Sequence, residues 1–471
     1  MQAVGPYLKE MGLSAADRQD VLRARHSFDE EGACSYDLSG VTLERSDVAW
    51  LIRDHSVAPC GPRLRLIDAD LSGLDLSDLA FEDAELSGAR MARANLQRAV
   101  FRRANLSDAR LACAECEEAV FEDAILERAS LEGAGLMGAN LRRARMAFAN
   151  LDGASMPNAN LEGADLLEAR LQNVYLGAAS LAGANLMGAH LERSSFLWGR
   201  LQDVQLAGSF LKDAALWRAQ LQRANLAGAI LDDVDLTEAH LEGANLAGAR
   251  LLGTNLTRAT LDNETSLERI VVGTGPRGLT LADVRWNGVN MAVFDWTPMR
   301  RLADESGARA ADRGEGPMKP AEAYAAAARA SQQLSLQLQQ RGMITEAERF
   351  ALRARVMQRL ELRRAGSKAI PRYLFSLALA LLAGYGYRPS RGFLTYLVVI
   401  ATFSVVYFFA GAHSVVEAIV VSVTAFHGRG FFSTQFSPSD PLAIVSSLEA
   451  FIGLIIEIVL IATISQRLFG K

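Results

Sequence analysis

Cysteine is scarce in this sequence, and its four copies among 471 residues are not spaced with histidines in the way metal ligands are. Cys113 and Cys116 form a C-x-x-C pair, but Cys116 also occupies an apolar position of the repeat described below. We therefore interpret Cys34, Cys60, Cys113 and Cys116 as structural thiols of a reducing compartment. No metal and no cofactor is expected.

Charge of one sign is also lacking. The chain has 49 Lys and Arg against 54 Asp and Glu, a net charge of −5, so the composition does not indicate a nucleic-acid partner. The N-terminus has no apolar run flanked by basic residues, so a cleaved signal peptide is not predicted and the N-terminal bulk is expected in the cytoplasm. Because the repeat contains no nucleophile, metal cluster or phosphate loop, the protein is not expected to be an enzyme.

A five-residue period dominates the first half of the chain. Every fifth residue from Leu66 to Leu261 is apolar, alanine is the usual residue two positions earlier, and Asn or Asp often stands between them. This period is neither the 3.6 of a helix nor the 2 of a strand. A chain that turns a corner every five residues would place one large and one small side chain inward per segment.

The A-(N/D)-L-x-x period resembles the pentapeptide-repeat family, and the resemblance implies a right-handed quadrilateral β-helix with four segments per coil. About ten coils at the ~4.8 Å spacing between strands would give a rod roughly 50 Å long. We assign residues 61–300 to this solenoid, with a closing coil after the period breaks at 262–278. Its outward residues, such as Arg102 and Glu118, form either a solvated face or a binding face for an unidentified protein or ligand.

The segments around the rod are predicted from local pattern. Residues 1–60 are expected to cap its exposed end, with a helix from Ser14 to about Phe28 and a second over 47–55. Residues 301–370 are expected to form a linker and a helical hairpin with helices over 320–335 and 345–364. Residues 371–390 are too short an apolar stretch to span a membrane, and they are expected to form an interfacial helix behind a basic collar.

Residues 391–471 contain two long apolar runs, Phe393–Ala412 and Pro441–Ile464, each long enough to cross a hydrocarbon core of ~30 Å. Basic residues precede the first run and follow the second, which predicts that both ends of this region are cytoplasmic. The sequence thus predicts a multi-pass protein of the inner (plasma) membrane in contact with lipid.

Between the two runs lies the shorter apolar segment Glu417–Phe432, with Gly428-Arg429-Gly430 near its end. A helix, a half-inserted helix, a Gly-x-Gly turn and a second helix resemble the two-helix pore module of the potassium-channel superfamily. The resemblance implies a homotetramer in which backbone carbonyls of a pore loop replace the water shell of a permeant ion. The matching residues of that loop are Ala425, Phe426, His427, Gly428, Arg429 and Gly430.

The loop departs from the family pattern. Ala425-Phe426-His427-Gly428-Arg429-Gly430 stands where the family has Thr-Thr-Val-Gly-Tyr-Gly, so both threonines are missing and Arg429 replaces the tyrosine. Ion selectivity therefore stays open. His427 is either a packing residue or a group that titrates in the pore mouth.

Three residues of the second apolar run are candidates for roles in the pore. By resemblance, Glu449 is a structural partner behind the loop, and it could pair with Arg429. Glu457 is either a pore-lining carboxylate that attracts cations or a buried, hydrogen-bonded carboxyl. Gly453 matches the family's hinge, with close helix packing as the alternative.

Taken together, these patterns predict a multidomain protein, with a β-helix solenoid, a helical hairpin and a two-helix pore domain. The function expected from them is a tetrameric, cation-conducting channel with a cytoplasmic repeat domain that acts as a sensor or scaffold. The alternative is a membrane-anchored protein-binding scaffold that conducts nothing.

Overall fold

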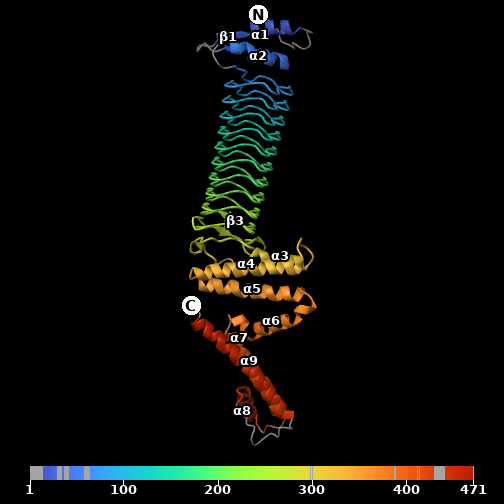
Figure 1. Cartoon of the computed structure of the whole chain (residues 1–471), viewed down its shortest axis with the longest axis vertical. Helices are drawn as coiled ribbons and strands as arrows, with labels where there is room; N and C mark the ends of the chain where they lie inside the picture. Colours follow the sequence, from blue (N-terminus) through green and yellow to red (C-terminus); the bar gives the residue numbers. More distant parts are fainter. Residues whose placement is uncertain are drawn as a thin grey trace. The chain divides into compact units, whose positions relative to one another are not determined.

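The computed structural model describes residues 14–28, 34–36, 42–57, 64–297, 299, 301–386, 389–410, 412, 414–428 and 441–469. The chain divides into two compact units, Met1–Ser306 and Gly307–Lys471. The first unit contains an N-terminal cap and a solenoid, and the second is helical (Figure 1).

The cap consists of helices α1 (Ala15–Ala24) and α2 (Arg45–Val57) and a small antiparallel pair, β1 (His26–Phe28) with β2 (Cys34–Tyr36). Ser14 and Asp17 form the predicted capping box at the start of α1. The prediction that this helix continues to about Phe28 is wrong, because the chain leaves the helix at Arg25 and enters β1.

The cap meets the first coil of the solenoid. Buried Arg18 of α1 donates from Nε to Asp47 Oδ1 of α2 at 3.0 Å, which holds the two helices together. From α2, Arg45 donates to the backbone carbonyls of Asp75 at 2.9 Å and of Ser77 at 2.7 Å. These donors pair backbone acceptors at the end of the solenoid, as expected of a cap.

The solenoid has four sides. Parallel bridges join residues 20 positions apart in four ladders, which begin at Arg65↔Glu85, Asp70↔Arg90, Asp75↔Asn95 and Ala80↔Val100. Each inward residue donates its N–H to the next coil, as Leu66 does to the Glu85 carbonyl at 2.8 Å. The predicted corner every five residues is therefore confirmed, with 20 residues per coil (Figure 1).

Leucine and alanine fill the interior of the solenoid, and nearly all of them are fully buried. Phe81, Phe101 and Phe121 replace leucine in three successive coils, and neighbouring rings stack with centroids 5.0 Å apart. Burial of each large side chain contributes ~1.5–3 kcal/mol before chain entropy is subtracted.

Asparagine before the inward leucine stabilises the corners. Asn95 Oδ1 accepts the N–H of Gln97 at 3.1 Å, and its Nδ2 donates to Asp75 Oδ1 of the previous coil at 3.1 Å. The same pair of contacts recurs at Asn225 and Asn255, so the predicted turn and side-chain ladder roles of these residues are confirmed.

The last coils lose the strict register. Asn245 pairs with Ser266 and Asn255 with Thr280, because residues are inserted around β4 (Val271–Val272), which pairs in parallel with β3 (Arg250–Leu251), and around the short helix η1 (Gly275–Arg277). The period then resumes as predicted, and its large side chains close the solenoid interior together with the short helix η2 (Met291–Val293): Leu281, Trp286, Met291 and Trp296 are all buried.

A buried carboxyl lies where the solenoid ends. Asp304, in the first turn of α3 (Ala303–Asp312), accepts the N–H of Leu281 at 2.8 Å, and burial raises its pKa from 3.8 to about 7. The folded state therefore holds a proton between these values that the unfolded state releases.

We expect this unit to lose stability as pH rises from about 4 to about 7, because the folded protein must then ionise a buried acid. Urea midpoints of the full-length protein across this range measure the effect. Asp304→Asn should flatten the dependence, and an unchanged slope in that variant would contradict the assignment.

The second unit begins with a helical hairpin of α4 (Pro320–Gln340) and α5 (Ile344–Arg364), which turns at Gly342 with φ +76°. The predicted hairpin is thus present, with a first helix longer than the expected 320–335. Ser335 Oγ of α4 donates to the Ala347 carbonyl of α5 at 2.7 Å, and Arg364 pairs with Asp312 of α3 at 2.6 Å.

The basic collar leads through the short helix η3 (Ser367–Ala369) into α6 (Ile370–Ala383). This helix ends at Gly384, whose left-handed φ of 55° opens the one-turn helix η4 (Gly384–Gly386). The large apolar side chains of Leu374, Phe375 and Leu381 are exposed by 56–67%. An exposed apolar face on a short helix fits the predicted interfacial position.

Candidate functional site

Two helices of the second unit are long and apolar enough to cross a membrane: α7 (Pro389–Phe409) and α9 (Pro441–Phe469). Their most apolar stretches are only 17% and 22% buried, whereas the core helix of a soluble protein is mostly buried. The two apolar helices predicted from the sequence are therefore present.

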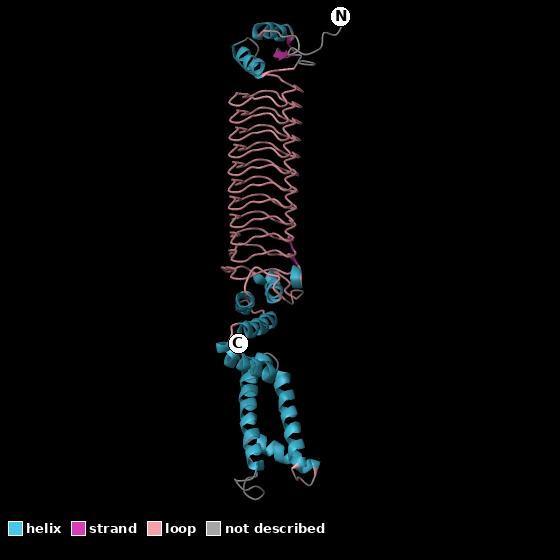
Figure 2. Ribbon diagram, turned by 90° about the vertical axis from the view of Figure 1, so that its right-hand side faces the viewer, coloured by secondary structure: helices cyan, strands magenta, loops and turns pink. Residues whose placement is uncertain are grey.

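A third, shorter helix lies between them. Helix α8 (Val415–Phe426) has 12 residues and begins at Ser414, whose hydroxyl accepts the N–H of Glu417 at 3.1 Å. Its last residue, Phe426, packs against Ile400 of α7 and Ile456 of α9. Figure 2 shows α7 and α9 side by side, with α8 between them at the end away from the C-terminus.

Helix α8 reaches far along its two neighbours. The ring of Phe426 contacts Tyr396, 13 residues before the end of α7, and its carbonyl faces Gly453, 12 residues after the start of α9. At ~1.5 Å per helical residue, both contacts lie about 18–20 Å from those helix ends. That distance is more than half of the ~30 Å thickness of a hydrocarbon core.

Gly453 is the point of closest approach between α9 and the end of α8. A Cβ atom built on Gly453 would lie 2.0 Å from the Phe426 carbonyl oxygen and 2.9 Å from its carbon. Real side chains do not approach backbone atoms so closely, so any larger residue would push the two helices apart. This contact supports close packing as the role of Gly453, and the hinge stays a prediction.

Glu449 joins the three helices from within. Its carboxylate is fully buried, accepting a hydrogen bond from Tyr407 Oη of α7 at 2.9 Å and another from Ser422 Oγ of α8. A buried carboxylate needs such partners to offset its desolvation. Sequence analysis did not identify Tyr407, although a hydroxyl inside an apolar run is a signal for this kind of contact.

We expect Glu449→Ala to destabilise the second unit by ~3–5 kcal/mol, because two buried hydroxyls lose their acceptor. Tyr407→Phe removes only one hydrogen bond and should cost less, ~1–3 kcal/mol. Thermal unfolding of the detergent-solubilised protein, followed by size-exclusion chromatography, measures both. Equal melting of Glu449→Ala and the wild type would contradict a positioning role for this carboxylate.

The predicted pore residues gather at the C-terminal end of α8. His427 lies directly after Phe426, and its Nε2 is 3.4 Å from Glu457 Oε1 of α9. Gly428 follows with a left-handed φ of 65°, and Ala425 is buried. Arg429 and Gly430 lie outside the described residues, as does any pairing of Arg429 with Glu449.

The electrostatics of this end favour a cation. The C-terminus of a helix carries a partial negative charge of about half an electron, and Glu457 adds a carboxylate beside it. The side chains of His427 and Glu457 are 37% and 35% exposed, so a solvated ion can reach them in one copy of the chain.

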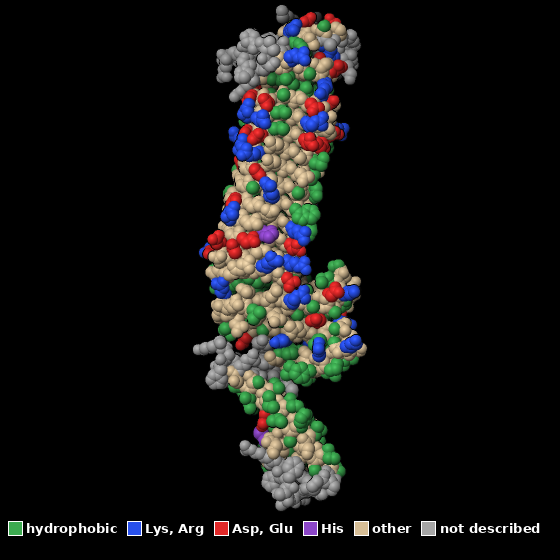
Figure 3. Space-filling view, viewed as in Figure 1, with side chains coloured by type: hydrophobic (Ala, Val, Ile, Leu, Met, Phe, Trp, Pro, Cys, Tyr) green, Lys and Arg blue, Asp and Glu red, His purple; other side chains and the backbone are tan. Residues whose placement is uncertain are grey.

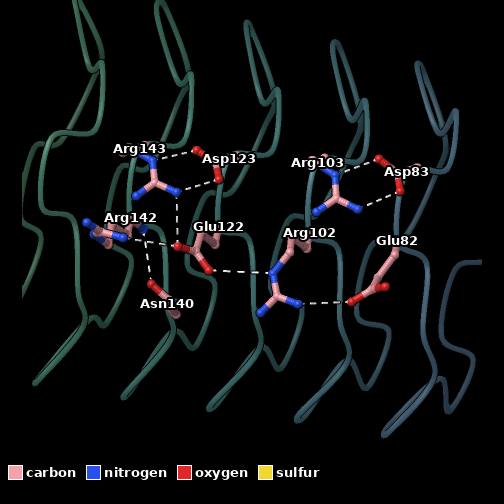
Figure 4. A network of polar contacts seen from close by, with 9 residues as sticks. All are labelled: Glu82, Asp83, Arg102, Arg103, Glu122, Asp123, Asn140, Arg142 and Arg143. Atoms are coloured by element: carbon pink, nitrogen blue, oxygen red, sulfur yellow. Dashed lines mark hydrogen bonds and ion pairs between the residues drawn. The ribbon is translucent and has the colours of Figure 1, made fainter.

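The surface of the solenoid carries ladders of opposite charge. Figure 4 shows Glu82, Arg102 and Glu122 alternating over successive coils, beside the bidentate pairs Asp83–Arg103 and Asp123–Arg143. Exposed pairs of this kind contribute ~0–1 kcal/mol each. The charged coils therefore fit a solvated face, and Figure 3 shows acidic and basic side chains interspersed there.

Aromatic and apolar side chains occupy one corner of the middle coils. Trp198 and Trp217 lie in neighbouring coils with ring centroids 5.0 Å apart, and the Arg218 guanidinium lies 4.5 Å from the Trp217 ring centroid. Trp198 is 50% exposed at φ 55°, a left-handed position that disfavours bulky residues. Tyr175 and Met137, two further members of this corner, are also exposed.

Comparison with known proteins confirms the repeat. The family model of pentapeptide repeats matches residues 65–263 in overlapping copies. No curated protein matches the sequence.

Several solved structures are similar to the solenoid. HetL of Nostoc sp. strain PCC 7120, a pentapeptide-repeat protein involved in heterocyst differentiation regulation, is 29% identical, with 49% of this chain and 97% of HetL covered and a TM-score of 0.32. QnrB1, a plasmid-mediated fluoroquinolone resistance protein, is 16% identical over 48% of this chain and 92% of its own, with a TM-score of 0.22. A pentapeptide-repeat protein of the Arabidopsis thaliana thylakoid lumen is 27% identical over 22% of this chain and 68% of its own, with a TM-score of 0.20.

Proposed function

We propose that this chain is one subunit of a tetrameric, cation-conducting membrane channel with a cytoplasmic pentapeptide-repeat domain. The observation that carries the proposal is the depth of α8. A 12-residue helix that enters between two membrane-length helices and ends past their midpoint resembles a pore helix. The chain starts its next long helix only at Pro441, as a re-entrant loop requires.

The apolar surface of α9 supports assembly of several copies. Large side chains at helical spacing cover one face of this helix and are exposed by 53–71% in the single chain: Ile444, Leu448, Phe451, Leu454, Ile458 and Ile461. Lipid or another subunit has to cover such a face. The resemblance to the potassium-channel superfamily implies four copies, with both ends of the second unit cytoplasmic.

The carboxylate of Glu457 supports cation conduction. It lies beside His427 at the carbonyl end of α8, where the resemblance places the entrance to the filter. Four copies around an axis would form a ring of carboxylates, and such a ring attracts cations.

Planar bilayers provide the test. Purified tetramers should show unitary currents carried by cations, and Glu457→Gln should lower the cation conductance severalfold. Glu242→Gln, on the exposed solenoid surface, is the matched control and should leave conductance unchanged. Intact tetramers without unitary currents would refute conduction.

A second candidate function is a protein-binding scaffold anchored in the membrane. The exposed Trp198 and Trp217 favour it, because exposed tryptophans, tyrosines and arginines are typical of binding hot spots. The left-handed backbone at Trp198 would be easier for glycine or asparagine. Under this alternative, Trp198→Gly should abolish the cellular role while the protein stays folded and membrane-bound, whereas an undiminished role would argue against it.

A further inference from the structure

We infer that His427 and Glu457 form a binding site for a divalent transition-metal cation of the Zn²⁺ class. Each chain would supply one imidazole nitrogen and one carboxylate oxygen, the ligand types that Zn²⁺ accepts. The metal ion would sit between His427 Nε2 and Glu457 Oε1, at the C-terminal end of α8.

The hydrogen bond on the other ring nitrogen makes His427 a ready ligand. His427 Nδ1 lies 2.8 Å from the Val423 carbonyl oxygen. A carbonyl oxygen can only accept, so Nδ1 must carry the proton. In the neutral imidazole Nε2 then has the free lone pair, and this is the nitrogen that faces Glu457. Metal-binding histidines are typically held in this way, with the non-ligating N–H donated to a carbonyl or carboxylate.

The separation of the two facing atoms fits one metal ion between them. Nε2 and Oε1 are 3.4 Å apart. Zn–N and Zn–O bonds of ~2.0–2.2 Å at a tetrahedral angle place two ligand atoms about 3.4 Å apart. The two lone pairs repel each other when the imidazole is neutral and the carboxylate is ionised. A cation between them turns that repulsion into attraction.

The surroundings orient the imidazole without closing the site. The rings of Phe426 and Tyr396 lie 5.4 Å and 5.9 Å from the His427 ring, and both side chains of the pair remain about one-third exposed. In one copy of the chain, the described residues include no group of three or more His, Cys, Asp or Glu that could hold a metal. Water or the same pair from another copy would therefore complete the coordination.

Two other His–Glu pairs provide controls. His190 faces Glu192 at 3.5 Å and His240 faces Glu242 at 3.3 Å, both on the solenoid surface and both through Nδ1. In these pairs the partners are two residues apart on one segment, and His190 also stacks on Phe210. Their similar distance but different ring nitrogen makes them matched comparisons for the site on α8.

Titration calorimetry of Zn²⁺ into the detergent-solubilised full-length protein tests the inference. His427→Gln and Glu457→Gln should each weaken Zn²⁺ binding by at least about tenfold. His240→Gln should leave the affinity within about twofold of wild type. Co²⁺ in place of Zn²⁺ should give visible absorption bands of a low-coordinate site, and these should disappear in His427→Gln.

Several results would overturn the inference. Equal Zn²⁺ affinity in wild type and His427→Gln would do so, provided that size-exclusion profiles and melting temperatures show both to be folded. Displacement of Zn²⁺ by equal concentrations of Mg²⁺ would also do so, because it indicates an oxygen-only site. A pair that responds to pH but takes up no Zn²⁺ would indicate a shared proton instead.

The effect on current rests on the proposed channel function. There, Zn²⁺ held at this level should reduce unitary currents, and Glu457→Gln should relieve the block. The binding measurement needs no current, so the two proposals can fail separately. Zn²⁺ binding without currents would remove the channel and keep the metal site, whereas currents indifferent to Zn²⁺ in a protein that does not bind it would do the reverse.

Discussion

Gly453→Ala is expected to disrupt the helical unit, with a fall in melting temperature and loss of the native oligomer on size-exclusion chromatography. The added methyl group would lie 2.0 Å from the Phe426 carbonyl oxygen. This neighbour is backbone and cannot swing away as a long side chain can. The end of α8 must therefore move outward, which costs ~1–3 kcal/mol or more for an overpacked core.

Gly307→Ala is the matched control for this substitution. Gly307 lies within α3, is exposed, and has no atom near the position of an added Cβ. Alanine there should be neutral or stabilise the helix by up to ~1 kcal/mol. A Gly453→Ala protein that melts and elutes as the wild type does would show that α8 is not packed against α9 at this depth.

Leu161→Asp is expected to unfold the middle of the solenoid. Leu161 is fully buried among the inward leucines, and a carboxylate there has no partner. An unpaired polar or charged group in an apolar interior costs several kcal/mol, ~2–7 even for a neutral one. The opened coils should expose their arginines, so limited trypsin digestion should become rapid, and much of the protein should aggregate.

The outward residue Leu167 tests whether position rather than composition decides. It lies in the next coil segment at a corner and is only half-buried. Leu167→Asp should change stability by no more than about 0.5 kcal/mol and leave trypsin resistance intact. If both variants behave alike, the inward and outward assignment of the five-residue period is incorrect.

The solenoid could be predicted almost completely because each segment repeats the same local problem. One leucine and one alanine point inward and two residues turn the corner, so the pattern from Leu66 to Leu261 is enough to assign every position. The ends were harder. The chain leaves α1 at Arg25 for a short strand, and the register changes after Asn245, because these parts do not repeat.

The predicted site was recovered only in part. The lengths of the apolar runs identified α7 and α9, and the shorter apolar segment identified α8. The partners of Glu449 were not predicted, since Ser422 and Tyr407 lie 27 and 42 residues away in the chain. The pairing of His427 with Glu457 was also missed, because it depends on how deep α8 inserts.

The sequence by itself therefore determined the five-residue solenoid and the two membrane-length helices, because periodicity and hydrophobic length are properties of neighbouring residues. Only the tertiary structure decided which groups meet at the end of α8. Gly453 lets the two helices touch, Glu449 holds three helices through two hydroxyls, and His427 turns its unprotonated nitrogen to Glu457. These contacts join residues far apart in the chain, and packing geometry alone brings them together.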